Sequence, residues 1–202
     1  MSQDKLKILF LQPYPVGEAA GQRFKVEQAY QTLQDNGHEI TVNSFFNIST
    51  WRILYKKGLL TKKVFNIFLL WIKRLFFLTT IHRYDVVYVF MWVTPRGYPI
   101  SEWFVRKLSK KLIVDVDDEV YKTNDLNLLS SFFSCKPKSK YLVQNGDIVF
   151  HNSPHSAQEC KKLNIFSNVI HMPCSFDMQR YKPKIHVKKD YLTVGWTGTF
   201  SS

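Results

Sequence analysis

Residues 7–44 read KILFLQPYPVGEAAGQRFKVEQAYQTLQDNGHEITVNS, and this stretch decides the fold. The apolar run 7–11 ends in a turn with two prolines, which is typical of a buried parallel strand that leads into a loop. A helix is expected over 22–36, because apolar residues recur at helical spacing and Gly37 stands where a helix would end. The alternation over 38–44 predicts a second strand. This order of elements predicts the first unit of a parallel α/β sheet.

The same alternation of short apolar runs and helical patterns continues along the chain. Further strands are expected over 85–90, 111–116, 147–151 and 168–172. Further helices are expected over 99–110 and 154–163, the second with Ser153 as its N-cap. Strands that alternate with helices predict an α/β fold, namely a Rossmann-like, doubly wound parallel sheet with right-handed crossovers.

The composition favours a folded cytoplasmic protein with an anionic partner. Hydrophobic residues make up 45% of the 202 residues, which is enough for a sizeable core. The cysteines Cys135, Cys160 and Cys174 have neither CxxC nor metal-ligand spacing, so we expect a reducing compartment and no bound metal. The N-terminal apolar run is too short for a signal peptide. The formal net charge of +12 indicates a partner that carries negative charge.

The segment 51–84, called the basic-aromatic insertion below, interrupts the alternation. It contains eight Lys or Arg residues, eight aromatic residues and no Asp or Glu. Lys73 and Arg74 lie at the centre of its apolar stretch and make a membrane-spanning helix too costly. An amphipathic helix in the plane of a membrane fits better, with apolar residues at the acyl boundary and cations against anionic headgroups. The membrane-contacting residues expected on this basis are Trp51, Lys56, Lys57, Lys62, Lys63, Trp71, Lys73 and Arg74.

Two other interpretations of the insertion remain open. Its helices could pack their apolar face on the sheet and leave the lysines in solvent. Basic residues that are interleaved with aromatic ones also occur in proteins that bind nucleic acid. Because no recognisable nucleic-acid module accompanies the segment, we expect an anionic membrane surface, and no nucleic acid, as its partner.

The loop after the first predicted strand is a candidate phosphate-binding site. Gly17 and Gly21 would let backbone N–H groups approach a phosphate, next to Gln22 at the start of the helix. Arg23 adds a guanidinium that is suited to phosphate oxygens. Ordinary turn geometry is the alternative explanation for the two glycines.

A carboxylate cluster follows the strand expected over 111–116. Asp118 and Asp117 are the candidate catalytic residues, because a carboxylate at a strand end can accept a hydroxyl proton or bind hydroxyl groups. Of the two, Asp118 is the one expected to serve as the acceptor-side carboxylate. Helix capping is the structural alternative for both. Trp92 either stacks on the ring of a ligand or belongs to the core.

Several phrases of the sequence occur together in a fixed order. They are LQPYP (11–15), GQRFKVEQAYQTLQDNGHEI (21–40), TWRILYKKG (50–58), VTPRGYPISEW (93–103), KLIVDVDDEVY (111–121), DIVFHNSPHSAQECKKLN (147–164), NVIHMPCSFDMQRYKP (168–183) and VGWTGTFSS (194–202). In this order they resemble bacterial glycosyltransferase family 4-like proteins of GT-B fold, which build cell-surface polysaccharides. The resemblance spans nearly the whole chain.

The resemblance implies two Rossmann-like domains that face each other across a cleft. The chain would then hold an N-terminal acceptor-side domain over 1–183, a linker over 184–190 and the truncated start of a donor-binding domain over 191–202. Ser153 would lie on the substrate side, and Gly198 and Thr199 would approach the donor diphosphate. The nucleotide-sugar is implied as a donor substrate, and no cofactor or metal is implied.

The expected function is transfer of a sugar from a nucleotide-sugar to a lipid-linked or cell-surface polysaccharide acceptor. The enzyme implied is hexosyltransferase-like, and it would be peripheral on the inner face of the cytoplasmic membrane. The present chain, as the N-terminal part, is expected to be inactive alone.

One departure from the family pattern favours an alternative. Similar proteins often carry a His-Arg-Glu-like triplet before the Thr-Pro that matches Thr94-Pro95, whereas this chain has Phe90-Met91-Trp92. The alternative is a non-catalytic, membrane-associated binding or scaffold subunit that partners a donor-binding subunit.

Overall fold

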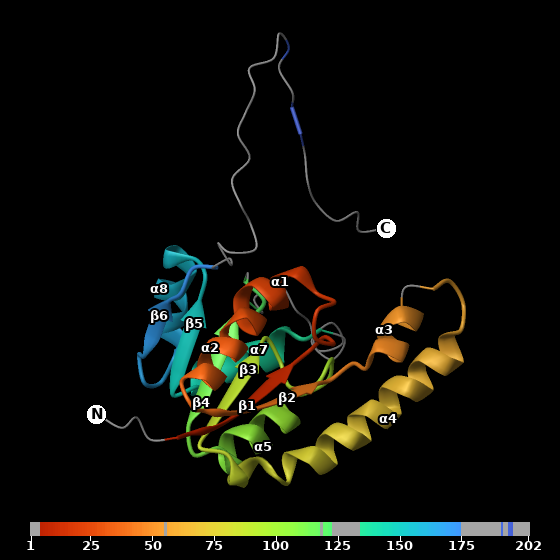
Figure 1. The fold of residues 1–202 in the computed structure, drawn as a ribbon, viewed down its shortest axis with the longest axis horizontal. Helices are drawn as coiled ribbons and strands as arrows, with labels where there is room; N and C mark the ends of the chain where they lie inside the picture. The colour runs from red at the N-terminus through yellow and green to blue at the C-terminus, as the bar shows by residue number, and fades with distance from the viewer. Residues whose placement is uncertain are drawn as a thin grey trace.

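The computed structural model describes residues 5–54, 56–117, 119–122, 134–174, 191 and 194–195. Within these residues one parallel sheet has the strand order β2-β1-β3-β4-β5-β6 (Figure 1). The strands are β1 (Lys7–Gln12), β2 (Glu39–Ser44), β3 (Val86–Phe90), β4 (Leu112–Val116), β5 (Ile148–His151) and β6 (Val169–His171). Each strand agrees with its predicted range to within one residue at either end. The predicted parallel α/β fold is therefore confirmed.

The helical elements follow the expected order with two differences. They are α1 (Ala20–Gln22), the π-turn η1 (Arg23–Glu27), α2 (Gln28–Asp35), α3 (Ile48–Leu54), α4 (Leu60–Leu78), the 3-10 turn η2 (Ile81–Arg83), α5 (Ile100–Leu108), α7 (Lys136–Asn145) and α8 (Pro154–Leu163). The single helix expected over 22–36 is a run of α1, η1 and α2. Helix α7 was not predicted at all.

Helices cover both faces of the sheet, as a doubly wound fold requires. Elements η1 and α2 pack Val26, Tyr30 and Leu33 over one face. Helices α5, α7 and α8 pack over the other face, where residues such as Leu142 and Cys160 join the core. Because successive residues of a strand point to opposite faces, a sheet covered on both sides needs apolar residues throughout its strands.

The basic-aromatic insertion forms α3 and α4, which stand beside the β2 edge of the sheet (Figure 1). Helix α4 buries Arg74 and Leu78 against the rest of the domain. In the described part of the chain, no helix is both long and apolar enough to cross a membrane. The predicted linker and the start of a second domain lie outside the described residues, except for residues 191, 194 and 195.

Candidate functional site

The strand order changes direction between β1 and β3, where doubly wound sheets usually open a crevice for a ligand. Here an aromatic cluster occupies the carboxyl ends of β2, β1 and β3. Its members are Tyr14, Phe45, Phe46, Trp51, Trp71 and Trp92, together with neighbouring aliphatic residues. Trp92 is 6% exposed, and its ring centroid lies 5.8 Å from that of Phe45. Trp92 is thus packed in the core, which favours the second of its two interpretations.

The backbone directs Trp92 into this cluster by a tight turn. Met91 has a φ of +63°, in the left-handed region, and the N–H of Trp92 donates to the carbonyl of Phe90 at 2.8 Å. The N–H of Met91 donates to the carbonyl of Asp115 at 2.8 Å. The carbonyl of Met91 accepts from the Ser139 hydroxyl at 2.8 Å. The segment that departs from the family pattern therefore lies within packed structure.

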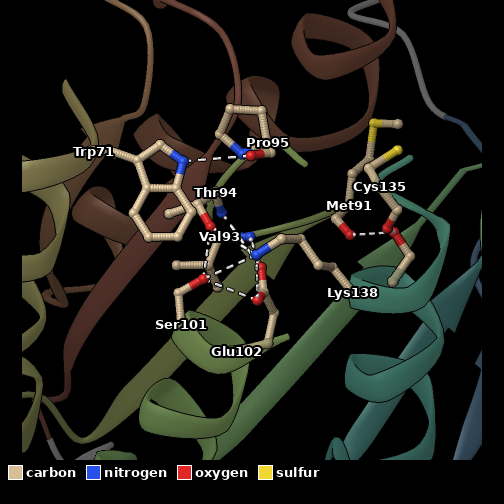
Figure 2. A network of polar contacts seen from close by, with 10 residues as sticks. Trp71, Met91, Val93, Thr94, Pro95, Ser101, Glu102, Cys135 and Lys138 are labelled. Carbon is tan, nitrogen blue, oxygen red and sulfur yellow. Dashed lines mark hydrogen bonds and ion pairs between the residues drawn. The ribbon is translucent and has the colours of Figure 1, made fainter. Parts of the chain in front are cut away.

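A buried ion pair supports the loop between β3 and α5 (Figure 2). The Nζ of Lys138 lies 2.9 Å from Oε2 of Glu102, and both side chains are fully buried. Lys138 also donates to the hydroxyls of Thr94 and Ser101, at 2.8 and 3.2 Å. Oε1 of Glu102 accepts from the N–H groups of Val93 and Thr94. Burial lowers the pKa of Lys138, and the charge of Glu102 opposes that shift.

The loop after β1 is closed by contacts with side chains of α1 and η1. The N–H of Gly17 donates to Oε2 of Glu27 at 2.9 Å, and Nε2 of Gln22 donates to Oε1 of the same carboxylate at 2.7 Å. The amide of Gln22 also bonds both backbone groups of Tyr14. Gly17 and Gln22 are therefore engaged within the loop, and Glu27 places a negative charge where a phosphate was expected.

Gly21 and Asp117 meet at the carboxyl edge of the sheet, and Asn152 joins them. Because β4 and β5 pair with Val116 opposite His151, the residues that follow these strands come together. The side-chain amide of Asn152 donates to Oδ1 of Asp117. A Cβ placed on Gly21 would lie 3.7 Å from Oδ2 of Asp117. We call this arrangement the Asp117 site.

Sequence reasoning missed Asn152 as a member of this site. The sequence does place Asn152 directly after a predicted strand, just as Asp117 directly follows β4. In adjacent parallel strands such positions lie at one edge. The side chain of Asn152 could have been placed next to Asp117 only if β4 and β5 were known to be neighbours.

A second buried ion pair lies beneath the Asp117 site. The Nζ of Lys25 lies 2.6 Å from Oδ1 of Asp115 and donates to the carbonyl of Val116 at 2.9 Å. The hydroxyl of Tyr88 donates to Oδ2 of Asp115 at 2.5 Å. Burial raises the pKa of Asp115, and the charge of Lys25 opposes that rise. These contacts fix the end of β4, and hence the position of Asp117.

Arg23 lines a cleft between η1–α2 and the sheet. The cleft has a volume of about 1320 Å³, and Phe10 and Phe150 are among its apolar lining residues. The guanidinium of Arg23 lies 5.3 Å from the ring centroid of Phe24, and its Nε has no hydrogen-bond partner among the described residues. Asp117 is not among the residues that line this cleft, whereas Lys25 is.

The remaining candidate residues have structural roles or lie outside the description. Ser153 is the N-cap of α8, and its Oγ accepts from the N–H of Ser156 at 3.5 Å. Asp118, Gly198 and Thr199 lie outside the described residues.

Three residues predicted to contact a membrane pack against other parts of the protein. Trp51 packs on Tyr14 with ring centroids 4.8 Å apart, and Nε1 of Trp71 donates to the carbonyl of Pro95 at 3.4 Å. Arg74 is 3% exposed and donates to the carbonyl of Asn43 at 3.2 Å. Burial lowers the pKa of Arg74, and the charge of Glu102 opposes this. The tertiary fold therefore corrects the lipid-facing assignment of Arg74, whereas Trp51 and Trp71 are half-buried.

Four of the five predicted lysines of the insertion are exposed. Lys56, Lys57, Lys62 and Lys73 are exposed. Lys63 is half-buried and donates to the carbonyl of Lys56 at 2.5 Å.

No group of three or more His, Cys, Asp or Glu side chains in the described ranges is arranged to hold a metal ion. Comparison with models of protein families found no match, and a search of curated proteins found none either.

Proposed function

We propose that this chain is the acceptor-side domain of a glycosyltransferase that transfers a sugar from a nucleotide-sugar to a lipid-linked or polysaccharide acceptor. The observation that carries the proposal is the Asp117 carboxylate at the carboxyl edge of a doubly wound sheet, held by Asn152 on one oxygen and facing Gly21 with the other. The ordered phrases of the sequence support the same class of enzyme.

The geometry suits Asp117 to the role of general base. Asn152 occupies Oδ1, which leaves Oδ2 to accept a proton from an acceptor hydroxyl. Gly21 has no side chain, so a hydroxyl group has room to approach Oδ2. In the proposed step the acceptor oxygen forms a bond to the anomeric carbon, its proton passes to Asp117, and the nucleoside diphosphate leaves with the electrons of the broken bond.

The donor would be bound mainly by a second domain, across a cleft from this edge. The enzyme is proposed to work at the inner face of the cytoplasmic membrane, where a lipid-linked acceptor resides. The exposed lysines of the insertion support this location, because cations next to an anionic leaflet are attracted by about 1 kcal/mol each.

The proposal is tested by measuring release of nucleoside diphosphate from UDP-, GDP- and dTDP-hexoses in the presence of membrane lipid extract. Both the 202-residue chain and the polypeptide of the full open reading frame that contains it are assayed. Release is expected only from a polypeptide with the donor domain, and only with the extract. Turnover by the 202-residue chain would refute the division into domains. No turnover by the polypeptide of the full open reading frame, with any donor, would refute the function.

A scaffold subunit is the second candidate, and one observation favours it. Phe90 and Trp92 are 2% and 6% exposed, so the position of the family's polar triplet holds core residues. In that case the chain would co-purify with a separate donor-binding subunit. The rate of sugar transfer by this chain together with the donor-binding subunit would then be the same for the wild type and Asp117→Asn.

A further inference from the structure

One face of α4 exposes a continuous apolar surface. Phe76 is 74% exposed, Leu60 is 73% exposed, and Phe68 is 60% exposed. We call the whole set the α4 stripe, and its members are Leu60, Val64, Phe65, Phe68, Leu69, Ile72, Leu75 and Phe76. Their spacing of mostly three or four residues places them on one side of the helix. Proteins that stay in water rarely leave so many large apolar side chains together on the surface.

Cations border this stripe, and no acid accompanies them. Lys62 and Lys73 are exposed and eleven residues apart, which is about three helical turns, so they lie on the same side of α4. Lys56 and Lys57 are exposed in the segment before the helix. No Asp or Glu occurs between Phe45 and Tyr84. The surface therefore combines apolar side chains with uncompensated positive charge.

We propose that the α4 stripe inserts into an anionic lipid leaflet, with α4 parallel to the membrane plane. The apolar side chains would leave water for the acyl boundary, and the flanking lysines would contact the negatively charged headgroups. The inward-facing side of the helix, with Arg74 and Leu78, stays packed on the domain. This inference does not rest on the proposed glycosyltransferase activity.

The charges around the α4 stripe favour an anionic lipid leaflet over a second copy of the chain or a nucleic acid. In an antiparallel contact between two copies through the stripe, Lys62 of one copy would lie near Lys73 of the other, with no carboxylate from this segment between them. A nucleic acid would satisfy the cations but would leave the exposed phenylalanines in water. An anionic leaflet satisfies both parts of the surface.

Vesicle flotation of the 202-residue chain tests the proposal. Phosphatidylcholine vesicles are compared with vesicles that also contain phosphatidylglycerol. The variant Phe68→Ser/Phe76→Ser removes apolar contacts, and Phe166→Ser, at a side chain 48% exposed elsewhere, is its control. The variant Lys62→Gln/Lys73→Gln removes two cations, and Lys107→Gln/Lys161→Gln is a control with the same loss of charge at exposed positions.

The chain is expected to float with the anionic vesicles and to bind the neutral ones weakly. Each α4 variant should lower the partition coefficient by about tenfold or more, while both controls should leave it nearly unchanged. Circular dichroism is expected to show intact folding, because the substituted side chains are exposed.

Three results would overturn the inference. One is absence of flotation with anionic vesicles, and another is binding that the phenylalanine variant does not weaken. The third is a dimer in light scattering that the same variant dissolves, since this would assign the stripe to a second copy. Nucleoside diphosphate release in detergent is measured separately, so failure here leaves the proposed function standing.

Discussion

Lys138 and Glu102 place two opposite charges in an interior that excludes water. Removing a charge from water costs several kcal/mol, and the cost is recovered only when a partner and hydrogen bonds are in place. Lys138 has contacts to Glu102, Thr94 and Ser101, which match the three donors of an ammonium group. The network thus fixes α7 against the loop between β3 and α5.

Lys138→Met is expected to lower the free energy of unfolding by about 3–5 kcal/mol, because it leaves the charge of Glu102 buried and unpaired. Chemical denaturation measures the change. Lys161→Met, the same substitution at an exposed position of α8, should stay within about 0.5 kcal/mol of the wild type. Equal effects of the two substitutions would show that the ion pair does not form.

Cys160 provides a prediction about pH. Burial raises the pKa of this thiol from 9.0 to about 11, and a hydrogen bond with Tyr121 opposes the rise. As the pH increases past 9, the unfolded chain ionises first, so the folded state holds more protons and loses relative stability until about pH 11. The free energy of unfolding should fall by up to about 1.4 kcal/mol per pH unit in this window, relative to Cys160→Ala. If the free energies of unfolding of the wild type and Cys160→Ala changed equally with pH between about pH 9 and 11, the raised pKa of Cys160 would be disproved.

At the scale of elements, the strands were predictable because most of them are short apolar runs, and β2 alternates between polar and apolar residues. Helix α7 was not, since its apolar residues are sparse and it buries Lys138 and Ser139 through polar contacts. For α4, apolar residues occur all around the helix. Arg74 points toward the domain because it donates to the carbonyl groups of Gln12 and Asn43. These acceptors lie far from Arg74 in the sequence, so the pattern of residues around Arg74 could not predict its burial.

Substitutions at Gly21, in α1, test whether the acceptor reaches Oδ2 of Asp117 past this residue. A Cβ at this position makes only an ordinary contact with Asp117, so Gly21→Ala should keep the fold, and the helical position should favour alanine by up to about 1 kcal/mol. Gly21→Leu should also fold but should cover Oδ2, and it is expected to slow sugar transfer at least about tenfold. Thermal unfolding and transfer rates of the two variants are measured together. Undiminished transfer by Gly21→Leu would mean that the acceptor does not approach past Gly21.

At the scale of the molecule, parallel strands bring residues from distant parts of the chain to one edge. The sequence was sufficient to predict that Asp117 stands at this edge, since it follows an apolar run. It was insufficient to predict that Asn152 meets it, or that the aromatic cluster fills the carboxyl ends of β1 and β3. Both features depend on strand order and on contacts of α3 and α4 that are far apart in the sequence.

We propose that Asp117 takes the proton of the acceptor hydroxyl during sugar transfer. The most direct test is kcat/KM for transfer to lipid extract, measured with the full open reading frame's polypeptide as wild type, as Asp117→Asn, and as Asp35→Asn at an exposed position of α2. If Asp117 is the general base, kcat/KM should fall at least about 100-fold in Asp117→Asn and stay near the wild-type value in Asp35→Asn. Full kcat/KM in Asp117→Asn, with folding intact, would contradict it.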